Sequence, residues 1–132
     1  MLTNGGRDHA LACVYGTSAQ PAASNYIGLT ANSTSPSAGN TTLSGEITTA
    51  GGGLVRAQAT YAHTTGQATA TLTRAFTANG SDSLPVTVAK IGVFTASTSG
   101  TMTNETLLSA TATLSASGDS VTVTETITAS GS

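Results

Sequence analysis

The chain has 132 residues, the length of one domain, and only ten of them are charged, which gives a net charge of −2. Its four cations, Arg7, Arg56, Arg74 and Lys90, are scattered, so it lacks the basic cluster that nucleic-acid binding or ionic attachment to a membrane surface requires. No apolar run approaches the roughly 18 residues of a membrane-spanning helix. We therefore expect neither nucleic acid nor a membrane as a partner.

Large apolar side chains are few in this sequence. Leu, Ile, Val and Phe together account for 23 of the 132 residues, Trp is absent, and Ala, Thr, Ser and Gly fill most of the remainder. Each strand of such a chain gains little from burial. Association with further copies or with a partner is therefore expected to bury more surface.

The N-terminal segment is expected to begin with a flexible arm, residues 1–7, in which the run Asn-Gly-Gly forms a turn. The segment has neither the basic nor the apolar stretch of a signal peptide, so we expect synthesis in a cytoplasm. The single cysteine, Cys13, cannot form an internal disulfide, which agrees with a reducing place of synthesis. A weak alternation from His9 to Tyr15 predicts the first strand.

The middle of the chain alternates between strands and loops. Residues 25–30 are strand-like, and residues 31–42 have no hydrophobic period, which predicts a loop long enough to lie across a surface or a neighbour. Residues 43–47 form either a single helical turn or a short edge segment. The glycines at 51–53 are expected to act as a flexible joint, because the Lys and Ser or Thr of a phosphate-binding loop do not follow them.

The second half predicts regular antiparallel strands. Residues 54–62 indicate one half-buried strand, with residues 67–79 as its hairpin partner. In the central strand, residues 84–94, the apolar residues change parity near Ala89 and Lys90, which implies a bulge or a change of partners. Two further strands follow at 106–115 and 121–127. Glu125 shares the parity of the apolar residues, so either it pairs with a cation or the strand leaves the core.

These strand lengths and turns predict an all-β fold. We expect one antiparallel β-sandwich domain over residues 8–132, jelly-roll-like, with about seven or eight strands. No amphipathic helix longer than one turn is expected.

Five segments together carry a resemblance to known proteins. They read NYIGLTANSTSPSAGNTTLSGEI, GGGLVRAQATY, TLTRAFTANGS, VAKIGVFTASTSGTM and SGDSVTVTETIT. They resemble a group of small all-β virion proteins of tailed bacteriophages, which serve as capsid decoration or cement proteins, head fibres or tail-fibre components. The resemblance runs from about Gly6 to Thr128. It implies a structural role on the particle as a trimer or other symmetric oligomer, and no catalytic residues.

Candidate catalytic and metal-binding groups carry weak signals. Asp8, His9 and His63 lack the spacing of a zinc site. Cys13 stands among small residues, as a buried apolar filler does, and is not expected to be a thiol nucleophile. No GxSxG segment marks one of the many serines as a nucleophile. We therefore expect no enzyme activity, no metal and no cofactor.

Threonine dominates one side of two predicted strands, at residues 69, 71 and 73 and at residues 122, 124, 126 and 128. Such a face presents hydroxyls without charge, so it is either solvated or packed against a neighbouring subunit. Arg56 and Arg74, on adjacent predicted strands, are candidates to anchor such contacts through bidentate pairs. The residues predicted to make oligomer or capsid contacts are Arg7, Tyr26, Arg56, Tyr61 and Arg74.

The leading interpretation is a virion protein that decorates and stabilises the capsid exterior. It would act as a homotrimer in contact with the major capsid protein or another virion protein, through residues 1–7 and 31–42. One alternative is a head-fibre, tail-fibre or tail-tip component, and another is a carbohydrate-binding adhesin domain. Few aromatic side chains are available to stack on a sugar, which disfavours the adhesin: Tyr15, Tyr26, Tyr61, Phe76 and Phe94.

Overall fold

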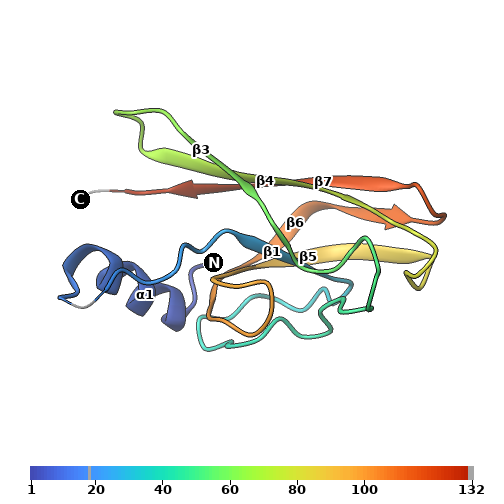
Figure 1. Ribbon diagram of the computed structural model, residues 1–132, viewed down its shortest axis with the longest axis horizontal. Helices are drawn as coiled ribbons and strands as arrows, with labels where there is room; N and C mark the ends of the chain where they lie inside the picture. Colours follow the sequence, from blue (N-terminus) through green and yellow to red (C-terminus); the bar gives the residue numbers. More distant parts are fainter. Residues whose placement is uncertain (18, 131–132) are drawn as a thin grey trace.

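Strand β5 (Val86–Phe94) lies inside the larger of two antiparallel sheets in the computed structural model, which describes residues 1–17 and 19–130. This sheet, sheet A, has the order β2-β1-β5-β6, and the smaller sheet B has the order β3-β4-β7. The sheets face each other as two layers, with helix α1 beside sheet A (Figure 1). The predicted all-β sandwich is confirmed. The remaining elements are α1 (Asn4–Tyr15), β1 (Tyr26–Thr30), β2 (Ala57–Gln58), β3 (Thr60–His63), β4 (Thr69–Thr77), β6 (Met102–Leu114) and β7 (Ser120–Thr128).

The register of β5 explains why its apolar residues change parity. Its pairing with β1 is regular, but its pairing with β6 shifts between Val88 and Lys90. Val88 and Ile91 therefore both reach the core between the sheets, although they have opposite parity in the sequence. The predicted bulge is confirmed.

The core lies between the two sheets and is built from few large side chains. Phe76 is the largest of them and is 1% exposed. Burying one such side chain stabilises the fold by roughly 1.5–3 kcal/mol relative to leaving it exposed. Sheet A contributes Ile27, Leu29, Val88, Ile91, Val93 and Leu114, and sheet B contributes Leu72, Phe76 and Val123.

Part of the outer face of sheet A is buried as well, because the predicted loop over residues 31–42 and the residues after it cover that part. Leu43 packs with Phe94 and Met102 in a second apolar cluster. Residues 43–46 form a turn, and Glu46 then makes a bridge to Thr30, so residues 43–47 are a short edge segment. Covered on both sides, β5 is buried from Val88 to Phe94.

The single strand predicted over residues 54–62 is wrong, because the chain changes sheets at Ala59. Strand β2 pairs with β1 in sheet A, whereas β3 pairs with β4 in sheet B. Ala59 lies between them, 7% exposed, and its N–H donates to the Asn25 carbonyl at 2.8 Å. The crossing leaves Tyr61 on the edge strand of sheet B, 61% exposed. The alternation continues through the crossing, so the sequence pattern cannot reveal it.

The strand predicted over residues 9–15 is also wrong, because α1 occupies this segment. Its N-cap is Thr3, whose Oγ1 accepts the Gly6 N–H at 3.0 Å. The helix ends at Gly16, whose N–H donates to the Ala12 carbonyl at 3.0 Å. The weak alternation is equally compatible with helical spacing of Leu11, Val14 and Tyr15. At 12 residues, α1 is longer than the single turn expected.

The arm expected over residues 1–7 is held to sheet A, and its boundary falls inside α1. Leu2 forms an antiparallel bridge with Asn104 of β6, and the Thr3 N–H donates to the Thr103 carbonyl at 2.9 Å. At Gly6 the helix backbone touches the same strand, since a Cβ there would lie 2.1 Å from the Thr103 oxygen. The N-terminus therefore extends the β6 edge of sheet A.

Candidate functional site

The outer face of sheet B consists of small uncharged residues, and we call it the threonine face. Residues of the opposite parity, such as Leu72 and Val123, point into the core. The register places Thr73 between Thr60 and Thr124, and Thr71 between Ala62 and Thr126. The face comprises Thr60, Ala62, Thr69, Thr71, Thr73, Ala75, Thr77, Ser120, Thr122, Thr124, Thr126 and Thr128.

The threonine face is solvent-accessible and well suited to contact with another surface. Most of its residues are exposed, and Thr71 and Thr73 in the middle are half-buried. Neighbouring strands place the hydroxyls in rows about 4.8 Å apart. Covering such a face buries no charge and orders only short side chains, so the desolvation and entropy costs are small. The threonine pattern predicted from the sequence does lie on one exposed face.

Helix α1 presents apolar side chains to solvent. Leu11 is 58% exposed, Val14 is 69% exposed and Tyr15 is 77% exposed. They are spaced three and four residues apart, so they share one side of the helix. Gly6 is the residue of α1 that is buried. Adjacent exposed apolar side chains of this kind are typical of a protein contact surface.

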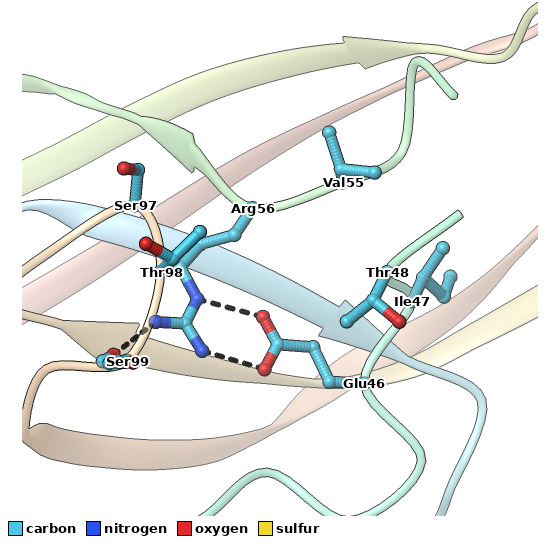
Figure 2. Close-up of a pocket in the computed structure, with 8 residues that line it drawn as sticks. All are labelled: Glu46, Ile47, Thr48, Val55, Arg56, Ser97, Thr98 and Ser99. Atoms are coloured by element: carbon cyan, nitrogen blue, oxygen red, sulfur yellow. Dashed lines mark hydrogen bonds and ion pairs between the residues drawn. The ribbon is translucent and has the colours of Figure 1, made fainter. Parts of the chain in front are cut away.

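Arg56 joins three segments of the chain beside an open hollow of about 380 Å³. Its Nε and Nη2 donate to the two carboxylate oxygens of Glu46 at 2.8 and 2.7 Å. Its Nη1 donates to the carbonyls of Ala96 at 3.1 Å and Ser99 at 2.7 Å. The guanidinium also lies over the ring of Phe94. Figure 2 shows Arg56 reaching between Glu46 and the loop of Ser97, Thr98 and Ser99.

This arrangement directs the Arg56 donors into the protein. The Arg56 and Glu46 side chains are 11% and 13% exposed, and they satisfy each other. The hollow beside them is lined by the polar residues Ser97, Thr98 and Ser99 and by the apolar residues Ile47 and Val55. Arg56 is thus a structural brace in this structure.

The other predicted contact residues lie apart from one another. Arg7 is exposed on α1 and bonds to Asn4 within the same helix. Arg74 is exposed on β4, where it donates to the Gln58 carbonyl at 3.4 Å. Arg56 precedes β2 in sheet A, so the two arginines expected on adjacent strands belong to different sheets. Tyr61 is exposed, whereas Tyr26 is half-buried against the second apolar cluster.

A second brace lies on the outer face of sheet A. Lys90 Nζ lies 2.6 Å from Glu105 Oε1, and both side chains are 1% exposed. The other carboxylate oxygen accepts Asn40 Nδ2 at 2.7 Å and the Ser37 N–H at 3.3 Å. Lys90 Nζ also donates to the Thr34 carbonyl at 3.1 Å. The pair therefore holds the loop of residues 31–42 against the sheet.

Two buried or partly buried carboxyl groups are kept ionised by their surroundings. Burial raises the pKa of Glu105, but the contacts with Lys90, Asn40 and Ser37 outweigh it and hold the pKa below its ordinary value. Burial likewise raises the pKa of Asp82. The backbone hydrogen bonds from Asn79, Gly53 and Leu54 outweigh this effect, so the pKa lies below its ordinary value. Glu125, on the core-facing parity, accepts a hydrogen bond from Thr106 Oγ1 of the facing sheet at 2.8 Å.

The fold does not bring the candidate metal-binding and nucleophilic residues together in the part of the chain that the structure describes. Within residues 1–17 and 19–130, no three His, Cys, Asp or Glu side chains are grouped to hold a metal ion. His63 lies on β3, and its Nδ1 is 2.9 Å from the Thr69 carbonyl. Cys13, expected in a strand, is half-buried on α1.

Sequence reasoning singled out Arg56 but missed its partner Glu46 and the group formed by Asn40 and Glu105. Glu46 lies ten positions from Arg56, and Asn40 lies 65 positions from Glu105, so no short motif pairs them. The one available signal was the small number of charged residues. In a chain with so few charges, each charged side chain is more often held by a specific partner. Lys90 in the middle of an apolar strand was the clearest such case.

Comparison with models of known protein families finds no match, and comparison with curated proteins finds none either. In the part of the chain that the structure describes, no helix is both long and apolar enough to cross a membrane. The interpretation of function therefore depends on the surfaces described above and on the resemblance of the sequence segments.

Proposed function

We propose that this chain is a non-enzymatic structural protein of a tailed-bacteriophage virion that decorates and stabilises the capsid exterior as a homotrimer. The observation that carries the proposal is the threonine face, an exposed sheet surface of Thr, Ser and Ala. An exposed surface without charged side chains favours packing against a neighbouring subunit, because covering it leaves no charge unpaired.

A second contact surface on a different element supports the same function. The exposed side of α1, with Leu11, Val14 and Tyr15, belongs to the element beside sheet A, whereas the threonine face belongs to sheet B (Figure 1). A subunit with two separate contact surfaces can touch two neighbours at once. Many weak contacts of this kind stabilise a shell through multivalency. The major capsid protein is the partner proposed for at least one of them.

The proposal is tested by placing a charge at an exposed position of the threonine face. Thr124→Lys should reduce occupancy on purified particles at least tenfold, because a lysine would be desolvated at the contact. Thr111→Lys is the matched control, since Thr111 is an exposed threonine of β6 in sheet A. Both variants should keep the wild-type Tm. Equal occupancy of the two variants would contradict the assignment of the threonine face.

Imaging of labelled protein on virions distinguishes the related alternative. Many copies spread over the head support decoration. A few copies at one vertex or on the tail would instead favour a fibre or tail-tip component.

The hollow beside Arg56 favours a second candidate, a carbohydrate-binding adhesin. Ser97, Thr98 and Ser99 line this hollow and carry hydroxyls suited to a sugar. A glycan array with the purified protein tests the candidate. Saturable sugar binding that is lost in Thr98→Ala would favour the adhesin over decoration.

A further inference from the structure

Lys90, Glu105 and Asn40 form a connected polar group on the outer face of sheet A. They come from β5, from β6 and from the loop of residues 31–42. Lys90 Nζ lies 2.6 Å from Glu105 Oε1, and Asn40 Nδ2 lies 2.7 Å from Glu105 Oε2. One buried carboxylate therefore holds an amine at one oxygen and a carboxamide at the other.

Lys90 and Glu105 form a close ion pair in which one carboxylate oxygen faces only the ammonium group. Among the described residues Glu105 Oε1 has no hydrogen-bond partner of good geometry, although Lys90 Nζ is close to it. The hydrogen bonds of Nζ go to the carbonyl and Oγ1 of Thr34, at 3.1 and 3.4 Å. The amine, the carboxylate and the carboxamide are thus held in contact inside the protein. The ion pair braces the loop, and the same contacts bring together the three groups that an amide-forming reaction requires.

We propose that Lys90 and Asn40 become joined by an intramolecular isopeptide bond, with Glu105 as the group that moves the protons. The Lys90 ammonium gives one proton to Glu105, and the lone pair of the neutral amine attacks Asn40 Cγ to form the Nζ–Cγ bond. Glu105 relays a second proton from Nζ to Nδ2, the Cγ–Nδ2 bond breaks with its electron pair, and ammonia leaves. Glu105 keeps the first proton, and no oxidant or reductant takes part.

At rest the pair is ionised, because the contacts of Glu105 with Lys90, Asn40 and Ser37 hold its pKa below the ordinary value. The first proton transfer is therefore uphill, and burial lowers its cost because desolvation raises the pKa of the carboxyl group. A desolvated lysine amine is a nucleophile towards carbonyl groups. Glu105 touches both nitrogens that exchange protons, as a general acid and base must.

The backbone holds the reacting side chains in place. Lys90 lies in the centre of sheet A next to the β5 bulge. Asn40 is held by a turn in which its N–H donates to the Ser37 carbonyl at 3.0 Å, and the Ser37 N–H reaches Glu105 at 3.3 Å. Asn40 Cγ is bonded directly to Nδ2, so the reaction requires the Asn40 side chain to move along the carboxylate until Cγ meets Nζ. Such positioning supplies a large part of the rate of intramolecular reactions.

The product would tie the loop of residues 31–42 covalently to the central strand. It would replace a buried positive charge by an uncharged amide and cross-link positions far apart in the sequence, which constrains the unfolded chain. This inference is independent of the virion proposal, because it concerns the chemistry of the fold alone.

The intact mass of the denatured wild-type protein tests the inference. We expect a mass lower than that of the sequence by one ammonia molecule. Trypsin should then fail to cut after Lys90 and should yield a branched product in which residues 8–56 are linked to residues 75–132. An unchanged mass would overturn the proposal. Loss of water in place of ammonia would overturn the role of Asn40, because it would indicate an amide between Lys90 and Glu105.

One other reaction gives the same mass. A succinimide at Asn4 or Asn79, each followed by glycine, also loses ammonia, but it leaves Lys90 open to trypsin. Release of peptides 75–90 and 91–132 together with the mass loss would therefore also overturn the proposal.

Variants assign the roles of the individual residues. Asn40→Ala and Glu105→Gln should both restore the mass calculated from the sequence, and Asn40→Ala should lower the urea midpoint. Asn25→Ala is the control, since Asn25 precedes β1 and lies outside the loop of residues 31–42. It should keep the ammonia loss. Retention of the loss in Glu105→Gln would overturn the role of Glu105. The wild-type mass does not depend on whether any variant folds.

Discussion

The guanidinium carbon of Arg56 lies 3.4 Å from the centroid of the Phe94 ring. Phe94 ends the central strand, and Arg56 precedes the short strand on the far side of β1. The same guanidinium bonds Glu46 on two atoms and the carbonyls of the loop after β5. One side chain therefore holds this end of sheet A where few large apolar residues are available to do so.

Arg56→Met should destabilise the protein by about 3 kcal/mol, because it leaves the partly buried Glu46 carboxylate without its partner and removes the stacking on Phe94. Urea unfolding measures this change. Arg74→Met is the matched control. Arg74 is exposed and makes one hydrogen bond of 3.4 Å, so its loss should cost less than about 0.5 kcal/mol. Similar losses for the two variants would show that Arg56 is not a brace.

Gly6→Ala should loosen the attachment of α1 to sheet A. The added Cβ would lie 2.1 Å from the Thr103 carbonyl oxygen, and because that oxygen belongs to the backbone of β6 it cannot move aside cheaply. A loss of about 1–3 kcal/mol is expected, as for other overpacked sites. Amide hydrogen exchange in residues 4–15 should become faster.

Gly80→Ala serves as the comparison for this glycine. A Cβ at Gly80 meets no atom within 4 Å, so its stability should stay within about 0.5 kcal/mol of the wild type. If Gly6→Ala also changes the stability by less than about 0.5 kcal/mol, the close contact between α1 and β6 is not what holds the helix in place.

The sheet layers were predictable because their signals are local. Alternation located β4, β5 and β7, and the parity change at Ala89 and Lys90 located the bulge. The N-terminal helix was not predictable in this way. Its cap depends on Thr3, which also donates to the Met102 carbonyl at 2.5 Å, and its buried contact depends on Gly6. Both contacts are made to β6, about a hundred positions away in the sequence.

The structural role of the glycines at 51–53 could not be predicted from the sequence either, because it depends on contacts with a distant strand. The run of glycines at 51–53 suggested a flexible joint, but Gly53 lies where a Cβ would be 1.7 Å from the Thr77 carbonyl oxygen. The residue is required by a close approach of two backbones and not by flexibility. Of the candidate surfaces, the threonine face was predictable, because side chains alternate between the two faces of a strand and this alternation is visible in the sequence. The Arg56–Glu46 and Lys90–Glu105 pairs were not predictable, because the fold brings these residues together.

Asp82 should make part of the stability dependent on pH. Its carboxylate accepts the N–H groups of Asn79, Gly53 and Leu54 at 2.8, 2.9 and 3.4 Å, and its pKa is below the ordinary value because these bonds outweigh the effect of burial. The folded pKa lies below the unfolded one. The contribution is therefore complete above the unfolded value of about 4 and is lost as pH falls through the folded value.

Asp82→Asn tests this dependence. At pH 7 the variant should be less stable than the wild type by about 1 kcal/mol, because an amide accepts these bonds less well than a carboxylate. The difference should shrink as the pH of the urea titrations is lowered below 4, where the wild-type group becomes protonated. A difference that stays constant with pH would contradict the assignment.

The exposed side of α1 should contribute to association and not to folding. Val14 and Tyr15 are 69% and 77% exposed, so replacing both with serine removes almost no buried area and should change the stability by less than about 0.5 kcal/mol. If this side of the helix meets a neighbouring subunit, the double variant should lose particle occupancy or shift to a smaller species in analytical ultracentrifugation. Thr113→Ser, at an exposed position on β6, is the control for a surface substitution away from α1. It should change neither the particle occupancy nor the sedimentation. Unchanged occupancy and unchanged sedimentation of the double variant would remove α1 from the contact surfaces and leave the threonine face alone.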